Sequence, residues 1–239
     1  MAEHEPVEAR IALVYYSRFG VVRALAEAIG EGARAVPRVT VEHVALDDTP
    51  IGEPREGEST ADAGRRRAAV VNRLAAADAI VLGSPSYFGS MASAVKRFFE
   101  DVATSSTPLT ADKTRPWRNH LFHGKIAAAF AASGTPHGGN EETLQSLLIL
   151  AMHMGMVLVT PGQRLPILEA EDAPYGATAV SGPDGNRPPG ETELQAARAM
   201  GQRVAEIAVQ MHLGRSEWES RLRAVRKQQA STQTNDPSA

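Results

Sequence analysis

The chain of 239 residues contains no cysteine. This absence excludes disulfide bonds, thiolate metal sites and cysteine nucleophiles, so any redox chemistry has to come from a bound cofactor. The seven histidines are scattered without the spacing of metal ligands. We therefore predict no metal site, and we interpret His43 and His212 as surface residues. The formal net charge is only −3, so no general attraction to nucleic acid or to an anionic membrane is expected.

Long apolar segments and three well-known motifs are also missing. No apolar run approaches the roughly 20 residues of a membrane-spanning helix, and residues 1–10 are acidic and polar, unlike a signal peptide. The sequence lacks the Gly-x-Ser-x-Gly elbow of hydrolases, the Gly-x-x-x-x-Gly-Lys loop of NTPases, and a Gly-x-Gly-x-x-Gly turn after the first strand. We expect a cytoplasmic protein without a membrane span, which acts on small molecules or proteins rather than on nucleic acid.

What the sequence does contain is an alternation of strand and helix patterns, which is typical of a parallel sheet with helices on both faces. With 43% hydrophobic residues the chain can bury one good core. The patterns predict a doubly wound, five-stranded parallel sheet of the flavodoxin type, in the strand order 2-1-3-4-5. The expected strands cover residues 10–16, 39–45, 79–83, 125–132 and 156–161, and the expected helices cover 21–34, 64–76, 91–102, 144–152 and 191–211.

A single domain is expected to span residues 1–213, and the remaining segments are expected to be insertions, loops and an extension of it. Residues 103–123 have no clear period and are interpreted as an insertion, and 162–190 is predicted to be a long loop. Residues 214–239 form an extension. Within it we predict a basic helix that opens with a capping box of Ser216 and Glu219, followed by a disordered end.

Ligands of doubly wound sheets bind at the carboxyl ends of the strands. After the first strand, residues 17–20 lead into a helix whose N-terminal N–H groups can bind an anion. Ser17 could add a hydroxyl group and Arg18 a positive charge. A strand-to-helix turn that binds nothing is the alternative.

Two further loops have the composition of a ligand site. In residues 83–91, Pro85, Tyr87 and Phe88 suit a wall for a flat ring, although a simple helix start with Ser90 as N-cap is also possible. Residues 132–140 are rich in glycine and hydroxyl groups and could bond ring or ribityl oxygens, or could be an ordinary turn. Three such loops at three ligand-facing positions favour a binding site.

Several segments of the chain resemble the WrbA family, whose members are flavodoxin-like, FMN-dependent NAD(P)H:quinone oxidoreductases. The resemblance runs from about residue 11 to 211. The Pro-Tyr-Gly-Ala-Thr element at 174–178 is its most specific part, because ordinary flavodoxins lack it. The segments that carry the resemblance are 15–20, 83–91, 133–142, 155–157, 174–178 and 182–185.

The resemblance implies FMN as cofactor, NAD(P)H and a quinone as substrates, no catalytic side chain, and a homo-oligomer (a tetramer or dimer). It places the FMN phosphate on Ser17, Arg18, Phe19, Gly20, Val21 and Val22, and the flavin ring against Pro85, Ser86, Tyr87, Phe88 and Gly89. The ribityl chain and the ring edge would contact Ser133, Gly134, Thr135, Pro136, His137 and Gly138, and the substrates would contact Phe19, Trp117 and His153.

The resulting hypothesis is an enzyme that transfers two electrons from NAD(P)H to quinones by a ping-pong mechanism, with the flavin carrying the chemistry. Two alternatives remain open. One is an FMN-binding electron carrier or regulatory protein without efficient NAD(P)H oxidation. The other is a scaffold that has lost FMN and acts through its basic C-terminal helix.

Overall fold

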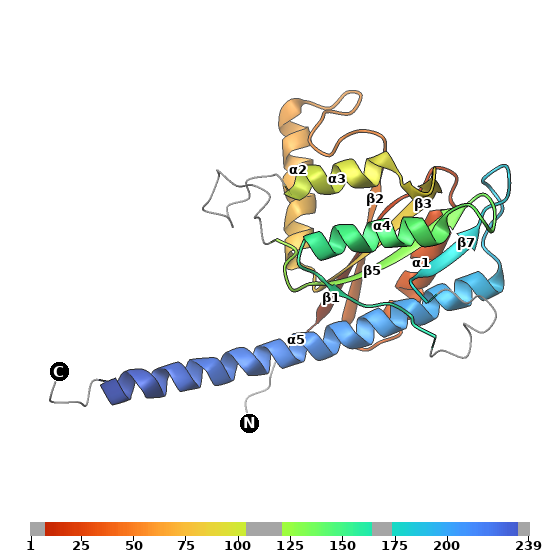
Figure 1. Ribbon diagram of the computed structural model, residues 1–239. Coiled ribbons are helices and arrows are strands. Elements are labelled where there is room, and N and C mark those ends of the chain that lie inside the picture. The colour runs from red at the N-terminus through yellow and green to blue at the C-terminus, as the bar shows by residue number, and fades with distance from the viewer. Residues whose placement is uncertain (1–7, 104–120, 164–173, 234–239) are drawn as a thin grey trace.

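The computed structural model describes residues 8–103, 121–163 and 174–233, and Trp117 lies outside these ranges. A central sheet carries helices on both of its faces (Figure 1). The strands are β1 (Ala9–Tyr16), β2 (Val39–Leu46), β3 (Ala79–Tyr87), β4 (Ser90–Met91), β5 (Ile126–Ser133), β6 (Val157–Leu158) and β7 (Ala177–Val180). The helices are α1 (Val21–Arg34), α2 (Thr60–Ala76), α3 (Ser93–Ala103), α4 (Asn140–His153) and α5 (Glu191–Gln233).

The main strands run parallel in the order β2-β1-β3-β5-β6, which confirms the predicted flavodoxin-like topology. The first strand β1 pairs with β2 from Ala9 opposite Val39, and with β3 from Ile11 opposite Ala79. Seven of the eight residues of β1 are buried, because helices cover both faces of the sheet at this position. The order of the strands reverses between β1 and β3, and this switch point is where ligands bind in such sheets.

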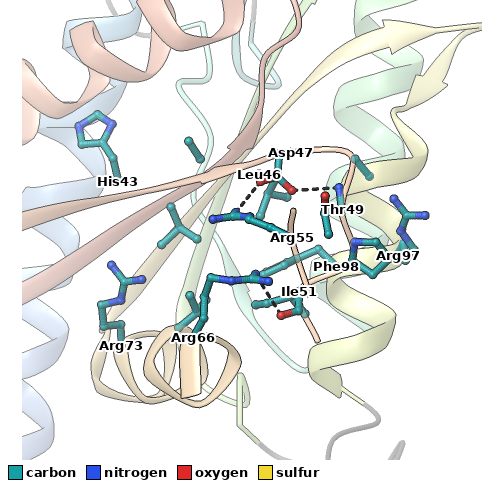
Figure 2. A pocket seen from close by; sticks show the side chains of 15 residues that line it. His43, Leu46, Asp47, Thr49, Ile51, Arg55, Arg66, Arg73, Arg97 and Phe98 are labelled. Carbon is teal, nitrogen blue, oxygen red and sulfur yellow. Dashed lines mark hydrogen bonds and ion pairs between the residues drawn. The ribbon is translucent and has the colours of Figure 1, made fainter. Parts of the chain in front are cut away.

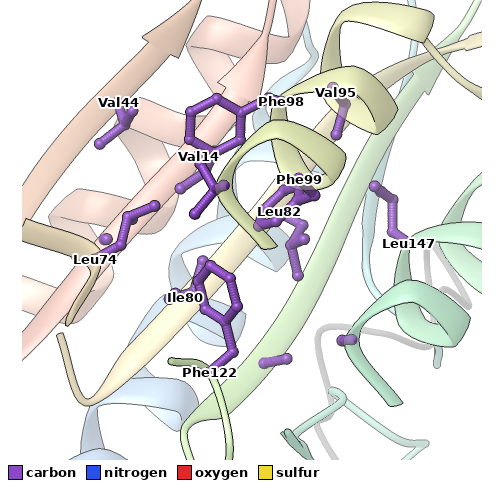
Figure 3. Packing of buried hydrophobic residues seen from close by; sticks show 14 of the residues in the cluster. Val14, Val44, Leu74, Ile80, Leu82, Val95, Phe98, Phe99, Phe122 and Leu147 are labelled. Atoms are coloured by element: carbon purple, nitrogen blue, oxygen red, sulfur yellow. The ribbon is translucent and has the colours of Figure 1, made fainter. Parts of the chain in front are cut away.

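Two apolar cores lie on opposite faces of the sheet. One core joins the sheet to α1 and α5, and the other joins it to α2, α3 and α4. Figure 3 shows the second core, to which Ile80 and Leu82 of β3 contribute together with Phe99 of α3. The rings of Phe99 and Phe122 meet at a centroid distance of 5.8 Å. Because both faces are covered, the ends of the strands are left as the place for a ligand.

Helices α1 and α5 cross unusually closely because glycines lie at the crossing. A Cβ atom on Gly32 would stand 1.9 Å from the carbonyl oxygen of Arg198, and one on Gly201 would stand 2.0 Å from that of Ile29. Each glycine therefore faces the backbone of the opposite helix, where no side chain has room.

The predicted helix at 21–34 is confirmed, but several other boundaries were wrong. The prediction started α2 at 64, but it starts at Thr60, because Ser59 caps it by accepting a hydrogen bond from the N–H of Asp62 at 3.2 Å. The third strand was expected to end at residue 83, ahead of Pro85, yet β3 continues to Tyr87. The missing N–H of Pro85 costs nothing there, because β1 pairs with β3 only as far as Gly83.

The fifth strand position is occupied in two pieces rather than by the predicted strand 156–161. The short strand β6 pairs with the start of β5, and β7 pairs with its end, from Phe130 opposite Ala177. Part of the predicted loop 162–190 is therefore strand, because β5 offers a free edge that orders it.

The C-terminal helices that were predicted separately are one helix, since α5 runs without a break from Glu191 to Gln233. Gly214 lies inside it, because a glycine weakens a helix without ending it. His43 and His212, which were interpreted as surface residues, are half-buried and partnered. The ring of His43 lies edge-on to Tyr15 at 6.0 Å, and Nδ1 of His212 lies 2.9 Å from Asp78.

None of the helices in the described ranges combines the length and the apolarity of a membrane span. The same part of the chain holds no group of three or more histidine, aspartate or glutamate residues that could bind a metal ion.

Candidate functional site

A cavity of about 290 Å³ lies at the carboxyl ends of β1, β3 and β5. It sits at the switch point of the sheet, where α1 begins. Side chains from all three predicted loops reach it, together with a fourth loop that follows β7. The lining residues are Ser17, Arg18, Phe19, Val21, Val22, Pro85, Ser86, Tyr87, Ala132, Gly134, Ser181, Gly182, Pro183, Asp184 and Gly185.

The start of α1 opens into this cavity, and its N-cap residue has no side chain that could cap the helix. Gly20 occupies the N-cap position in the left-handed region, with φ of 94°. The hydroxyl oxygen of Ser17 accepts the N–H of Arg23 at 3.1 Å. The N–H groups of Val21 and Val22 have no acceptor within the described part of the chain, and the positive end of the helix dipole adds to their attraction for an anion.

Arg18 adds a full positive charge at the mouth of the cavity. Its side chain is exposed, and its guanidinium carbon lies 5.8 Å from the centroid of the Phe19 ring. Phe19 is itself 60% exposed. An anion bound at the start of α1 would thus meet backbone N–H groups, the helix dipole and the positive charge of Arg18.

The second and third predicted loops are held against each other by Ser86. Its hydroxyl group donates a hydrogen bond to the carbonyl oxygen of Gly138 at 2.7 Å. A Cβ on Gly139 would lie 2.8 Å from the Cα of Gly89, so the two backbones touch. Ser133 donates to the carbonyl of Thr135 at 2.7 Å. The hydroxyl groups of Ser86 and Ser133 are thus engaged in hydrogen bonds to the backbone of the third loop.

Not every predicted residue lines the cavity. Thr135, Pro136 and His137 are exposed on the outer side of their loop, and only Ala132 and Gly134 of that region line the cavity wall. Gly138 instead approaches Ser133 so closely that a Cβ would lie 2.7 Å from it. The loop is thus present where the sequence predicted it, but a smaller part of it faces the cavity.

The aromatic segment after β3 forms a hairpin instead of a simple helix start. Tyr87 pairs with Ser90 of β4, and the two residues between them both have positive φ, 54° at Phe88 and 74° at Gly89. This is the geometry of a type I′ turn, in which the first position normally holds asparagine, aspartate or glycine. Phe88 is fully exposed there. The turn thus holds a large apolar ring in water at a cost of about 1 kcal/mol in backbone strain.

The fourth loop, residues 181–185, was not assigned to the site from the sequence. Ser181 ties it to the third loop, because its N–H and its hydroxyl group both donate to the carbonyl of Ser133, at 2.7 and 3.0 Å. Gly185 reaches Phe19 so closely that a Cβ would lie 3.0 Å from the ring. The Gly-Pro-Asp-Gly turn was the available signal, but it could not be placed without knowing that β7 joins the sheet.

Buried Glu193 anchors this fourth loop from α5. Its carboxylate accepts the N–H of Val180 at 2.8 Å and the N–H of Gly190 at 2.5 Å, and it pairs with Arg187 at 3.2 Å. The loop is therefore fixed at both of its ends by hydrogen bonds.

A larger apolar groove, of about 900 Å³, runs between α3 and α4 beside the cavity. Tyr87 lines both hollows, whereas Phe88 and the predicted substrate residue His153 line only the groove. The groove wall also contains Met91 and Ile149, and Ile149 is 50% exposed. Within the described residues, His153 is thus separated from the start of α1.

A third hollow, of about 190 Å³, lies between the end of β2, α2 and α3 (Figure 2). Two of the arginines that line it, Arg55 and Arg66, hold the loop that follows β2. Arg55 pairs with Asp47 at 2.5 Å, and Arg66 pairs with Glu58 at 3.0 Å while donating to the carbonyl oxygen of Ile51 at 3.1 Å. We interpret this hollow as a structural network.

The Arg66 network makes a testable contribution to acid stability. Hydrogen bonds from Arg66 lower the pKa of Glu58 from 4.5 to about 2. A carboxyl group whose pKa is lower in the folded state stabilises the fold fully above its unfolded pKa, and this stabilisation is lost as the pH falls from about 4.5 through 2. The parent should therefore unfold at a higher urea concentration than Glu58→Gln at neutral pH. This difference between the two midpoints should shrink as the pH falls from about 4.5 to 2. Urea unfolding at stepwise pH measures it, and Glu56→Gln on the same loop is the control. A difference that does not change with pH would contradict the role of the ion pair.

Comparison with known proteins agrees with this geometry. A family model described as NADPH-dependent FMN reductase matches residues 16–165. A protein of Caulobacter vibrioides named NAD(P)H dehydrogenase (quinone) is 35% identical over 209 residues, which cover 85% of this chain and 99% of that protein. A protein of the same name from Rhodopseudomonas palustris is 34% identical over 210 residues, with the same coverage.

The solved structures give the same assignment. A WrbA-like flavodoxin from Agrobacterium tumefaciens has a TM-score of 0.57 and 26% identity, covering 85% of this chain and 99% of its own. A flavodoxin from the domain Archaea, at 22% identity and a TM-score of 0.53, supports the fold alone. The sequence relatives and the shared topology together show that this chain belongs to the WrbA family, the flavodoxin-like NAD(P)H dehydrogenases (quinone).

Proposed function

We propose that this protein is an FMN-dependent NAD(P)H:quinone oxidoreductase that works at the switch-point cavity. The observation that carries the proposal is the start of α1, where the N–H groups of Val21 and Val22 have no acceptor among the described residues. This helix start opens into a cavity walled by the loops after β1, β3, β5 and β7. Small-molecule sites have this concave form with a few convergent polar groups. The names of the relatives supply the class of reaction.

The residues present fit FMN. The phosphate would be held by the N–H groups of Val21 and Val22 and by Arg18, which match its charge. Tyr87 and Pro85 offer flat apolar surface to the ring from one side, and Gly134 allows the backbone to approach its polar edge. The fourth loop closes the cavity at Gly182 and Gly185. Thr135, Pro136 and His137 would contribute only from the exposed rim.

The chain's own contribution is to bind, orient and exclude water. Bound FMN would supply the capacity to accept a hydride and to release two electrons. Among the described residues that line the cavity, Asp184 carries the only carboxyl group, and no histidine lines it. We therefore assign no acid or base to a side chain. One cavity that serves both substrates in turn implies a ping-pong mechanism, and we place the reaction in the cytoplasm, where NAD(P)H is available.

The experiment that tests this function follows the flavin by visible absorption. The protein is saturated with FMN, and spectra are recorded anaerobically before NADH, after NADH and then after benzoquinone. Loss of the flavin absorption with NADH and its return with benzoquinone are expected. A bound flavin that neither NADH nor NADPH bleaches would indicate an electron carrier or regulatory protein. Failure to bind FMN would contradict both and favour a scaffold.

We also propose that a second copy of the chain covers the groove between α3 and α4, in a dimer or tetramer. The groove exposes apolar side chains, and Phe88 stands fully in water at a strained turn beside it. Apolar patches of this kind mark interaction surfaces. The groove adjoins the cavity through Tyr87, so the partner would complete the outer wall of the substrate site.

Phe88→Asn tests this surface. Asparagine tolerates positive φ, so the turn should keep its shape while the apolar ring is lost. We expect a smaller mass in solution by light scattering over a range of concentrations. Phe88→Tyr keeps an aromatic ring and should keep the parent's mass. An unchanged mass for Phe88→Asn would place the contact between copies elsewhere.

A further inference from the structure

The C-terminal part of α5 projects from the domain as a single helix (Figure 1). Among the described residues, its last polar contacts with the rest of the chain are made by His212 and Arg215. Nδ1 of His212 lies 2.9 Å from Asp78, and Arg215 donates to the carbonyl oxygen of Gly124 at 3.1 Å. From Ser216 to Arg226 the side chains are exposed, except for half-buried Leu222. Isolated helices of this length are marginal in water, so a projecting helix needs a partner for its apolar side.

The projecting part carries an apolar stripe with coiled-coil spacing. Trp218, Leu222 and Val225 are separated by four and then three residues, which puts them on one side of the helix at alternating a and d positions. Trp218 is 61% exposed and Val225 is 49% exposed. Two large apolar side chains exposed at coiled-coil spacing on a projecting helix predict that a second helix packs against them.

The charges beside the stripe identify the partner and its direction. Glu217 and Arg221 pair within the helix at 2.8 Å. Glu219 and Arg226 border the stripe at equivalent heptad positions, about 10 Å apart along the axis, too far to meet. In the part of the chain that the structure describes, neither has an ion-pair partner.

We propose that this stripe packs against the same stripe of a second copy, with the two helices antiparallel. Leu222 then lies opposite Val225 of the partner subunit, and Glu219 lies beside Arg226 of the partner subunit. The two-fold symmetry makes each of these contacts twice. A parallel pair would instead place Arg221 beside Arg226 of the partner subunit, where like charges repel.

An anionic membrane surface fits the stripe less well. Membrane-surface helices carry cations along both borders of the apolar side. Here Glu219 shares one border of the stripe with Arg226, and Arg221 on the other border is paired with Glu217 at 2.8 Å. The mixed charge instead matches a second helix of the same sequence.

Because the chain lacks cysteine, engineered disulfides can test the direction of the pair in the full-length protein. Leu222→Cys and Val225→Cys proteins, one carrying a size tag, are mixed and oxidised. Mixed dimers should exceed the statistical share. Trp218→Cys alone should not cross-link, because the antiparallel register separates the two positions by roughly 16 Å. Arg223→Cys, on the far side of the helix, sets the background.

A charge exchange gives a second, independent readout of the same pair. Glu219→Arg should lower the yield of the mixed disulfide about fivefold, and adding Arg226→Glu should restore it. Cross-linking of Trp218→Cys with itself would overturn the antiparallel pair. If Leu222→Cys and Val225→Cys cross-link no more than the Arg223→Cys background, the proposal is overturned. Sedimentation of the unmodified protein with phosphatidylserine vesicles would then assign the helix to a membrane surface.

Discussion

Gly201→Ala is expected to lower the free energy of unfolding by about 2 kcal/mol, the typical cost of inserting a carbon into a close-packed contact. The new Cβ would lie 2.0 Å from the carbonyl oxygen of Ile29, which is backbone and cannot rotate away. Helices α1 and α5 would have to separate along their whole contact. The midpoint of urea unfolding measures the effect.

The matched control is Gly214→Ala on the same helix. A Cβ there meets no atom within 4 Å, so only the intrinsic preference of alanine for helix remains. This control should gain about 0.5–1 kcal/mol. The two substitutions are chemically identical, so their opposite signs isolate the helix contact. Equal midpoints for both variants would mean that the crossing relaxes without cost.

The second large effect is expected on binding of the cofactor phosphate. Arg18→Glu should weaken FMN binding about 10- to 100-fold, the range of a lost charge-assisted hydrogen bond. Riboflavin, which has the same ring without the phosphate, should bind the variant and the parent about equally. Quenching of flavin fluorescence measures both affinities.

Arg34→Glu makes the same charge change at the other end of α1 and should leave FMN affinity near the parent's value. If Arg18→Glu weakens riboflavin binding as much as FMN binding, the phosphate does not bind at the start of α1. Retention of FMN affinity would show that the backbone N–H groups suffice. The ratio of the two flavin affinities therefore separates the phosphate site from the ring site.

Much of the fold was predictable because local patterns and tertiary structure agree. The apolar stripe of α1, with Leu25 and Ile29 fully buried, has the period of a helix. The unbroken apolar run of β1 indicated a strand covered on both faces. The order of the strands followed from their alternation with helices and the handedness of crossovers.

The wrong boundaries arose where the neighbours of a segment decide its structure. Pro85 ends strands in general, but here it lies beyond the last pairing with β1. The strand β7 has only four residues, and it forms because β5 offers a free edge. The site was predictable to the level of its loops. Which residues of 133–138 face the cavity, and that 181–185 joins them, depended on contacts between loops. The assignment of single residues to FMN stays a prediction.

The division of the edge strand into β6 and β7 creates a site where additional sequence can be inserted. Just beyond β6, the N–H of Gly162 donates to the carbonyl oxygen of Pro174 at 3.0 Å, and β7 begins three residues later. The two ends of the intervening connection are thus pinned together independently of its length. Peptide tags or whole recognition modules inserted between 163 and 173 should therefore leave the pairing of the sheet and the switch-point cavity unchanged. This edge of the sheet is thus a suitable insertion site for engineering.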